Sequence, residues 1–297
     1  MELLQLRYFQ VVANNQHITR SAEQLHVSQP AISTVISRLE QELGTPLFER
    51  SGRTIALNTY GLVFLGYVNR ILLEVDNAQK EIRDLCMESD NTINLSVTSP
   101  QFLQGINEYM TGHPNTRWRQ SVKQLPEIMS LLENGQIDIS ITSPGFSLAN
   151  VESTVLLHDE FMIAMHPDHP LAGQQSITAE QIAKERFIAL QKGLPFRTQT
   201  DQLFADMGIE PNIVMECDHY LRRELLNTNA GITMASRSAQ FRHLYDPKIV
   251  FLKIENVKGG RDIVLSRLKG KYITKATQDF CAFLRAYYEK IALADNN

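Results

Sequence analysis

Residues 28–44 read SQPAISTVISRLEQELG, and this stretch decides the fold of the first part of the chain. Its apolar residues recur three and four positions apart; they are Ile32, Val35, Ile36, Leu39 and Leu43. This spacing predicts a helix with one apolar face, which must pack on a core. Ser28 can cap its N-terminus, Pro30 falls in the first turn, where a missing N–H costs little, and Gly44 follows the predicted C-terminus.

The opposite face of this helix is polar and carries little charge. Gln can form two hydrogen bonds to adenine, Ser and Thr can bond a base edge or a phosphate, and a Pro or Thr methyl can touch the methyl group of thymine. We therefore predict that this face reads DNA. The alternative is a three-helix interaction module whose polar face is merely solvated. The residues predicted to contact DNA from this helix are Ser28, Gln29, Pro30, Ser33, Thr34, Ser37 and Arg38.

Two helices are predicted before this one. The first covers residues 5–14, and its buried face consists of Leu6, Phe9, Val12 and Ala13. The second begins with Thr19 as its N-cap and ends near His26. Its predicted buried residues are Ala22 and Leu25. Arg20, at the start of this second helix, is a further candidate for contact with DNA phosphates.

A small hairpin is predicted after the third helix. Residues 47–50 lead into the turn Ser51-Gly52-Arg53, which is followed by the strand-like residues 54–57. A helix-turn-helix followed by a hairpin is a winged arrangement, and Arg50 and Arg53 flank its turn. We expect both arginines to reach backbone phosphate or the minor groove.

This N-terminal segment resembles the signature of the LysR-type transcriptional regulators over its full length. The matching residues are Ala22, Leu25, Ser28, Gln29, Pro30, Ala31, Ile32, Ser33, Ile36, Leu39, Glu40, Leu43, Gly44, Leu47, Phe48 and Arg50. Departures are His17-Ile18, Ser21 and the run 58–61, where Asn58 can still cap the next helix. The resemblance implies that the chain binds double-stranded DNA as a transcriptional regulator and is not an enzyme.

Bulk composition excludes little and does not by itself indicate DNA binding. The formal net charge is −4, and residues 1–58 contain five Arg, no Lys and five Glu, so the charges of the predicted DNA-binding domain cancel. Affinity must therefore depend on where the arginines lie. Hydrophobic residues make up 43% of the chain, which is typical of globular proteins. No apolar run is long enough to span a membrane and no export signal is recognisable, so we expect a cytoplasmic protein.

Residues 60–88 predict one long helix, because they contain no Pro and have Gly only near the start. Apolar residues alternate at spacings of four and three along it, as in a helix that pairs with another helix. These residues are Phe64, Val68, Ile71, Val75, Ala78, Ile82 and Leu85. Packing on the chain's own core is the alternative. The family resemblance favours a homodimer through this helix, which would set the spacing of the two DNA-reading helices, and implies a homotetramer.

Strands and helices alternate after the polar break at residues 89–91, which predicts βαβ units and a parallel sheet. Strands are expected at 93–98, 118–122, 137–141, 161–165, 187–189, 213–216 and 232–234, and helices from Pro100, over 127–132, from Thr178, from Arg197 and from Thr274. The last helix should bury Phe280, Phe283, Leu284, Tyr287 and Ile291. This part resembles the two-lobed effector domain of the LysR family, itself similar to periplasmic solute-binding proteins. The predicted domains are 1–58, a linker at 59–89 and 90–297, with a second lobe at about 162–264.

The predicted effector site lies where loops follow the carboxyl ends of strands, since helix N-termini there offer N–H groups to anions. Hydroxyl groups, free N–H groups and an arginine suit a small carboxylate-bearing metabolite. The alternative for any single Ser or Thr is simple helix capping. The candidate residues are Thr98, Ser99, Gln101, Thr142, Ser143, Gln191, Arg197 and Thr198.

Other chemistry finds little support. His158, His166 and His169 lie near acidic residues, but their spacing fits no metal motif, so we expect a solvated loop, no metal and no cofactor. The three cysteines, at positions 86, 217 and 281, form no CxxC pair and are expected to be buried thiols, while a redox role stays open. The competing function is a solute-binding or enzymatic domain whose N-terminal helices serve only for assembly. Strong salt dependence of DNA binding would distinguish the regulator from this alternative.

Overall fold

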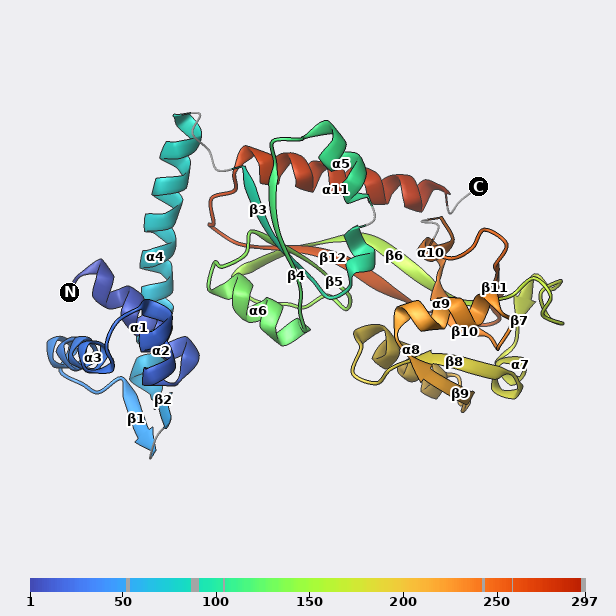
Figure 1. Cartoon of the computed structure of the whole chain (residues 1–297), viewed down its shortest axis with the longest axis horizontal. Coiled ribbons are helices and arrows are strands. Elements are labelled where there is room, and N and C mark those ends of the chain that lie inside the picture. The colour runs from blue at the N-terminus through green and yellow to red at the C-terminus, as the bar shows by residue number, and fades with distance from the viewer. Residues whose placement is uncertain (52–53, 87–90, 104, 242–243, 258, 295–297) are drawn as a thin grey trace. The chain divides into compact units, whose positions relative to one another are not determined.

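The computed structural model describes residues 1–51, 54–86, 91–103, 105–241, 244–257 and 259–294 (Figure 1). The chain divides into two compact units. The first contains Met1–Asp90 together with Gly270–Thr274, and the second contains Asn91–Lys269 and Lys275–Asn297. Within the described ranges, every helix is too short or too polar to cross a lipid bilayer.

The first unit is a winged helix-turn-helix followed by a long helix. Its elements are α1 (Leu3–Asn15), α2 (Ile18–Leu25), α3 (Gln29–Leu43), β1 (Phe48–Ser51), β2 (Thr54–Leu57) and α4 (Thr59–Leu85). The buried residues of α1 are the four predicted ones, Leu6, Phe9, Val12 and Ala13. The ring of Phe9 lies 5.5 Å from that of Phe48 and 4.9 Å from that of Phe64, so one aromatic side chain joins α1, the hairpin and α4.

Two local predictions in this unit are wrong. Helix α2 begins at Ile18 with His17 as N-cap, not Thr19, because the imidazole Nδ1 accepts a hydrogen bond from the backbone N–H of Arg20 at 3.3 Å. Leu43 was expected on the buried face but is 37% exposed, because it is the last residue of α3, where the helix ends at Gly44. Ser21, one of the family departures, is fully buried and donates a hydrogen bond to the carbonyl of His17 at 2.9 Å.

The apolar seam predicted along α4 divides into two parts. Val68 is buried and Phe64 partly buried in the core of the same unit, so this part of the seam serves the chain's own fold. Ile71, Ile82 and Leu85 are 42%, 61% and 79% exposed. The sequence could not separate the two parts, because heptad spacing is the same for a helix that packs on its own domain and for one that packs on a partner.

The second unit is built on one large mixed sheet and a small parallel one. The strands of the large sheet are β3 (Thr92–Val97), β4 (Arg117–Val122), β5 (Ile139–Thr142), β6 (Val151–Met165), β7 (Ser176–Ile177), β10 (Thr233–Ser236), β11 (Val250–Ile254) and β12 (Gly260–Leu268). Their order is β4-β3-β5-β12-β6-β11-β7, with β10 also paired to β6. The small sheet consists of β8 (Arg186–Leu190) and β9 (Asn212–Cys217).

Two lobes share this unit, and β6 and β12 connect them. In the first lobe the core joins β3, β5 and the long helix α11 (Lys275–Ala294); in the second lobe, the core draws on residues 161–257. The beginning of β6 pairs antiparallel with β12, and its end pairs antiparallel with β10 and β11. The expected parallel pairing is present among β3, β4 and β5, but the sheet is mixed, because β12 runs antiparallel to both β5 and β6.

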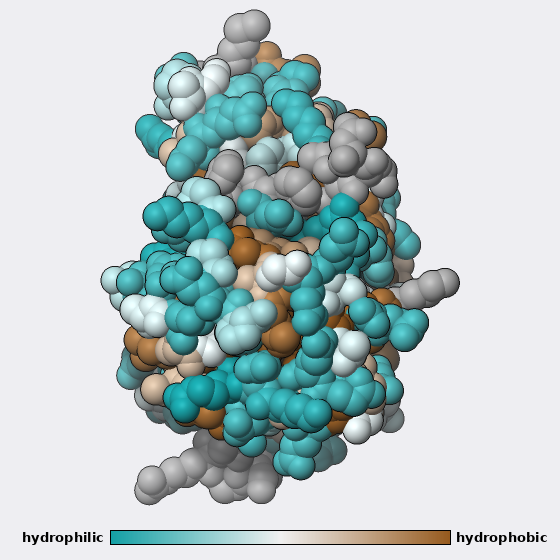
Figure 2. Space-filling model, turned by 90° about the vertical axis from the view of Figure 1, so that its right-hand side faces the viewer, coloured by the Kyte–Doolittle hydropathy of each residue, from teal (hydrophilic) through white to brown (hydrophobic). Residues whose placement is uncertain are grey.

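Helices cover the sheets of both lobes (Figure 1). They are the 3₁₀ turn η1 (Pro100–Leu103), α5 (Ile106–Gly112), α6 (Leu125–Glu133), α7 (Ala179–Lys184), α8 (Pro195–Asp206), α9 (His219–Asn227), α10 (Arg237–Phe241) and α11. The helix predicted from Pro100 is thus a single 3₁₀ turn followed by α5. Tyr288, not Tyr287, is the fully buried tyrosine of α11, and its hydroxyl donates to the carbonyl of Phe102 at 3.1 Å. Hydrophilic side chains predominate on the face drawn in Figure 2, with hydrophobic ones scattered among them.

Candidate nucleic-acid interface and small-molecule site

We call the winged helix-turn-helix of the first unit the head. The apolar face of α3 packs on the core of the head, so that the polar face of α3 is turned to solvent. Ile32, Ile36 and Leu39 are buried with exposures of 0%, 5% and 0%. Ser28 caps the helix and accepts a hydrogen bond from the N–H of Ala31, as predicted. Gly44 ends the helix with a φ of 71°, the left-handed conformation that glycine adopts without steric cost.

Some of the residues of α3 predicted to contact DNA already use their polar groups in hydrogen bonds within the helix. Thr34 donates its hydroxyl to the carbonyl of Pro30 at 2.9 Å, and Ser28 acts as the cap. Gln29, Pro30, Thr34 and Arg38 are exposed, whereas Ser33 and Ser37 are half-buried. The face therefore presents an amide, two hydroxyls and a guanidinium along successive turns, a set of groups that can bond base edges and phosphates.

Hydrogen bonds at both ends of the hairpin fix it to the neighbouring helices α3 and α4. Glu40 Oε1 accepts from the N–H of Leu47 at 2.8 Å, and Asn58 donates its amide to the carbonyl of Pro46 at 2.8 Å. Asn58 Oδ1 also accepts from the N–H of Gly61 at 2.9 Å, so the predicted cap of α4 ties the hairpin to that helix. No Cβ fits at Gly61, where it would overlap the carbonyl oxygen of Leu47.

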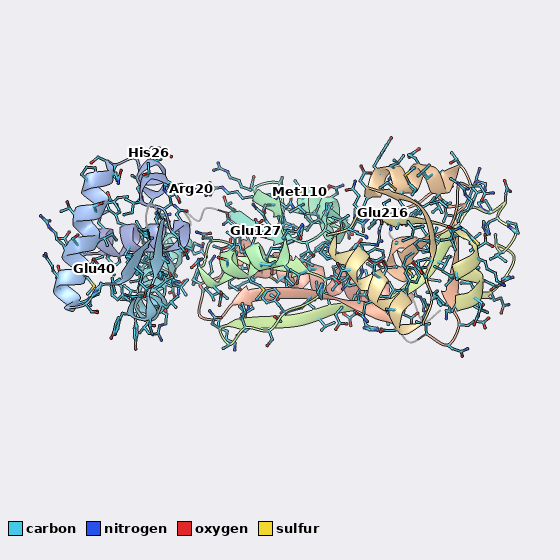
Figure 3. All side chains as sticks on the ribbon, turned by 90° about the horizontal axis from the view of Figure 1, so that it is seen from below. Arg20, His26, Glu40, Met110, Glu127 and Glu216 are labelled. Atoms are coloured by element: carbon cyan, nitrogen blue, oxygen red, sulfur yellow. The ribbon has the colours of Figure 1, made fainter. Side chains whose placement is uncertain are left out.

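The arginines predicted to touch DNA outside α3 are only partly described. Arg20 is exposed on α2, whose C-cap is His26, and Glu40 lies on α3 (Figure 3). In the hairpin, the backbone of Arg50 pairs with that of Ile55 in an antiparallel register. The side chain of Arg50 and the whole of Arg53 lie outside the described residues.

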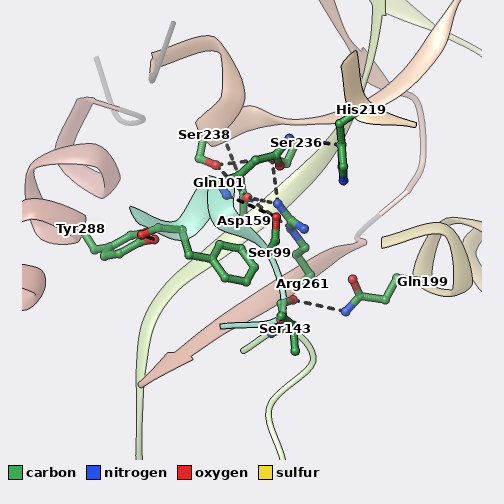
Figure 4. A network of polar contacts seen from close by, with 12 residues as sticks. Ser99, Gln101, Ser143, Asp159, Gln199, His219, Ser236, Ser238, Arg261 and Tyr288 are labelled. Carbon is green, nitrogen blue, oxygen red and sulfur yellow. Dashed lines mark hydrogen bonds and ion pairs between the residues drawn. The ribbon is translucent and has the colours of Figure 1, made fainter. Parts of the chain in front are cut away.

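In the second unit, side chains from the two lobes meet beside β6 and β12 (Figure 4). Gln101 Nε2 of the first lobe lies 3.2 Å from Nδ1 of His219, the first residue of α9 in the second lobe. Gln199 of α8 donates its amide to the hydroxyl of Ser143 at 3.3 Å. Two of the loops predicted for the effector, the one after β3 and the one after β5, therefore contribute to a junction with the second lobe.

Other predicted residues shape these loops. The hydroxyl of Thr98 accepts from the N–H of Ser143 at 3.1 Å, which fixes the two first-lobe loops to each other. Ser99 Oγ accepts from the N–H of Gln101 at 3.4 Å, the capping role that was the alternative for such residues. Thr142 is fully buried, and its hydroxyl has no hydrogen-bond partner among the described residues.

The third predicted loop behaves differently. Arg197 is 5% exposed and bonds Asp201, Glu216 and the carbonyl of Leu190 within the second lobe. Burial lowers its pKa, but the hydrogen bonds to the two carboxylates outweigh this effect and raise it. Gln191 and Thr198 are exposed. An arginine already compensated by two carboxylates has little attraction left for a ligand anion, so the geometry gives this loop no support as an effector contact.

A buried ion pair that the sequence did not reveal lies at the same junction. Asp159 of β6 and Arg261 of β12 face each other in register, and an Arg261 nitrogen lies 3.4 Å from Asp159 Oδ2. Ser238 donates both its N–H, at 2.9 Å, and its hydroxyl, at 2.8 Å, to the same carboxylate. The guanidinium of Arg261 stacks 4.6 Å from the ring of Phe196 and 5.5 Å from that of Phe102, one from each lobe.

A second arginine at the junction makes no ion pair with a carboxylate among the described residues. Arg222 of α9 is 4% exposed and bonds the carbonyl of Met234 at 3.1 Å and the hydroxyl of Tyr245 at 2.8 Å. Its Nε has no partner within the described part of the chain. Burial, together with the charges of Arg222 and Arg261, lowers the pKa of His219 to about 4, so this imidazole is neutral near pH 7.

The described histidines lie beside separate carboxylates, and the three cysteines are free thiols. Within the described residues no group of three or more His, Cys, Asp or Glu side chains could hold a metal ion. His158, His166 and His169 each lie beside a different carboxylate, at 2.9, 3.6 and 3.4 Å. Cys217 and Cys281 are buried as predicted, and burial raises the pKa of Cys281 to about 11. The prediction is wrong for Cys86, which is exposed at the end of α4.

Comparison with known proteins identifies the family to which both parts of the chain belong. Residues 3–62 match the model of the bacterial regulatory helix-turn-helix proteins of the lysR family, and residues 92–289 match the LysR substrate binding domain. The chain belongs to the LysR family of transcriptional regulators. It is therefore a DNA-binding transcriptional regulator with an effector-binding domain, as the resemblance in its first segment implied.

LysR-family relatives match the chain along nearly its whole length. The uncharacterized HTH-type transcriptional regulator YybE of Bacillus subtilis is 30% identical over 98% of this chain and 100% of that protein. The RuBisCO operon transcriptional regulator of Allochromatium vinosum is 26% identical over 96% of this chain and 95% of its own. The structure of a full-length OxyR variant from Pseudomonas aeruginosa has the same fold, with a TM-score of 0.68 at 23% identity over 97% of this chain and 94% of that one.

Proposed function

We propose that this LysR regulator reads a dyad DNA site as a homodimer or homotetramer and alters its DNA contacts when a small anionic metabolite binds between the two lobes. The polar, nearly uncharged face of α3 supports the DNA-reading half of the proposal. The buried guanidinium groups of Arg222 and Arg261 at the lobe junction, of which Arg261 pairs with the buried carboxylate of Asp159, support the effector half and carry the proposal.

For DNA reading, Gln29, Ser33 and Ser37 are the residues we expect to contact bases, and Arg38 and Arg20 to contact phosphates. Their placement along one exposed face fits insertion of α3 into the major groove. Each arginine that neutralises a phosphate releases counterions, so we expect DNA affinity to fall steeply as the salt concentration rises. The wing arginines, Arg50 and Arg53, are proposed to add further phosphate contacts.

The uncovered part of α4 supports a dimer. Tyr60, Val63, Tyr67, Ile71, Ile82 and Leu85 are large apolar side chains between 42% and 79% exposed on one helix. A row of this kind is costly in water and is proposed to pair with the same helix of a second copy. Sedimentation equilibrium at micromolar concentration tests this step, and a stable monomer would contradict it.

For the effector, the charges at the lobe junction favour an anion. Arg222 and Arg261 are both buried and flank the ring of Phe196, whereas Asp159 is the buried carboxylate that pairs with Arg261. The neutral His219 adds no charge near pH 7. A carboxylate placed near Arg222 would offset a buried cation whose hydrogen bonds within the described residues go only to neutral acceptors, and Gln101 and Ser143 would orient it.

The experiment that tests DNA reading is selection of genomic fragments by the purified full-length protein at near-physiological salt. Ser33→Arg places a long cation in the middle of the reading face. Gln41→Arg adds the same charge to an exposed position near the C-terminal end of the same helix and serves as the matched control. Enrichment of a few sites with an imperfect dyad, lost in the Ser33 variant and kept in the control, supports the proposal. Equal behaviour of the two variants would contradict it.

The effector half is tested by thermal shift with a panel of mono- and dicarboxylates and their neutral amide analogues. A ligand present at 100 times its Kd stabilises the folded state by about 2.7 kcal/mol, which thermal shift detects readily. We expect carboxylates to stabilise the native chain, and Gln101→Ala and Arg222→Gln to abolish the shift. Amide analogues that stabilise as well as the acids would refute an anionic effector without touching the DNA result.

A further inference from the structure

Residues 270–274, which join β12 to α11, belong to the first unit and not to the second. Asn77 of α4 holds this segment with both halves of its amide: Nδ2 donates to the carbonyl of Gly270 at 2.7 Å, and Oδ1 accepts from the N–H of Tyr272 at 2.7 Å. The hydroxyl of Tyr272 donates to Asp84 on the same helix at 2.8 Å. We call these three hydrogen bonds the Asn77 clamp.

The clamp is a built contact, not a chance approach of side chains. Asn77 and Asp84 are seven residues apart, so they lie on one face of α4 about two turns apart. An asparagine that bonds both a C=O and an N–H of the same segment imitates the pairing between two strands, which fixes orientation as well as distance. Lys271 and Ile273, within the held segment, are 9% and 8% exposed.

The chain leaves little slack between the clamp and the effector domain. Strand β12, which carries Arg261, ends at Leu268. Lys269, the one residue between this strand and the clamp, bonds the carbonyl of Asn150 through its N–H at 2.8 Å and that of Ala149 through Nζ at 2.8 Å. A displacement of β12 along its axis is therefore passed to Gly270 almost directly, because no flexible residues intervene.

We propose that Asn77 is a positioning residue that couples strand β12 of the effector domain to the linker helix α4. Movement of β12 on effector binding would shift the held segment, and the clamp would pass this shift to α4 and so to the DNA-reading head. The biological meaning of this coupling rests on the proposed function, but the contact and its mechanical effect do not. Asn77 acts without touching DNA or effector, so its loss should uncouple the two units while leaving each of them folded.

The first measurement is hydrogen–deuterium exchange of the full-length protein. In Asn77→Ala the N–H of Tyr272 loses its acceptor, so we expect peptides containing Tyr272 to exchange about tenfold faster, the factor for one lost hydrogen bond. Gln79→Ala, an exposed position on the same helix, is the matched control and should leave exchange unchanged. Equal exchange in the two variants would show that Asn77 does not hold the segment.

The second measurement tests coupling without DNA. In a Cys86→Ser background, Gln101→Cys and His219→Cys are joined by a short reversible bis-methanethiosulfonate reagent, and the cross-linked protein is purified and confirmed by mass spectrometry. With the clamp intact, we expect the cross-link to change exchange in residues 77–85 of α4, and reduction to reverse the change. Adding Asn77→Ala, or the milder Tyr272→Phe, should remove or reduce this response.

An α4 response that persists in the Asn77→Ala background overturns the proposal, as does the absence of any response with the clamp intact. Because no DNA or effector is present, a failure of the DNA-reading proposal leaves this result unaffected. Conversely, a protein that binds its dyad site but shows no coupling would keep the proposed function and lose the clamp.

Discussion

Replacing Asp159 by Ala should destabilise the second unit strongly, because it leaves the guanidinium of Arg261 buried without its carboxylate. The Asp159 side chain is fully buried and that of Arg261 is 5% exposed. Removing one partner of a buried ion pair costs roughly 3–5 kcal/mol. The N–H and the hydroxyl of Ser238 would lose their acceptor as well, so we expect the upper part of this range. Asp159→Asn keeps the shape and one acceptor and should fall in between.

A matched control exists on the same two strands. Glu152 pairs with Arg267 across β6 and β12, as Asp159 pairs with Arg261, but its side chain is 48% exposed and that of Arg267 46%. Exposed ion pairs contribute about 0–1 kcal/mol, so Glu152→Ala should change stability little. Both pairs join facing residues of the same two strands, so the difference between the variants reports burial together with the two hydrogen bonds that Asp159 accepts from Ser238.

The assay is denaturant unfolding followed by the fluorescence of Trp118, the single tryptophan of the chain. Trp118 lies in β4 with its ring 4.7 Å from that of Phe280, so its signal reports the first lobe of the second unit and not the head. In thermal melts a loss of 1 kcal/mol lowers Tm by about 2–4 °C for a domain of this size. A loss below about 1 kcal/mol for Asp159→Ala would refute the reasoning, because it would mean that the pair is hydrated or dispensable.

The remaining predictions concern pH, thiol reactivity and backbone packing. The pKa of His219 is about 4 in the folded chain, below the ordinary value of 6.5. Between these two pH values the unfolded state binds more protons, so the free energy of unfolding should fall as pH drops from 6.5 to 4. Denaturant titrations at several pH values should show a flatter pH profile for His219→Gln. Cys86 should react with iodoacetamide at pH 8 in the native protein, whereas Cys281, buried and with a pKa of about 11, should react only after unfolding, as mass spectrometry of the labelled chain would show. Gly61→Ala should destabilise the head by about 1–3 kcal/mol, measured by circular dichroism, because its Cβ would meet the carbonyl of Leu47; full stability would mean that the start of α4 shifts freely.

The spacing of apolar residues predicted the helices best, because the buried face and the caps of a helix follow from residues close together in the sequence. The four predicted core residues of α1 are its buried residues, and Ser28 and Gly44 bound α3 as the local cap rules require. Strand β6 shows the limit of such rules. It covers Val151–Met165, but only the part near 161–165 was predicted, because residues 152–155 are mostly exposed and carry no clean alternation. The strand exists because β12, more than a hundred residues later, pairs with it.

The residues of the candidate effector site also divide into those that local sequence could predict and those that only the tertiary structure brings together. Ser143 and Gln101 were predicted because they follow strands that are recognisable in the sequence. His219, Gln199 and Arg261 were missed because nothing local distinguishes them: His219 is the first residue of a short helix, and Arg261 meets its carboxylate only through the pairing of two strands. Arg197 looked like an anion contact for a good chemical reason, yet Asp201 and Glu216 already satisfy it.

The path of β6 and β12 between the lobes has a consequence for how the chain folds during synthesis. The core of the first lobe combines Ile93 and Leu95, made before the second lobe, with Phe280 and Tyr288, made after it. The core of the second lobe draws on residues between 161 and 257 and is complete before α11 has been made. We therefore expect the second lobe to become protected from proteases first on the ribosome, while the first lobe waits for α11. A truncation before residue 275 should leave a folded second lobe on an unfolded first one.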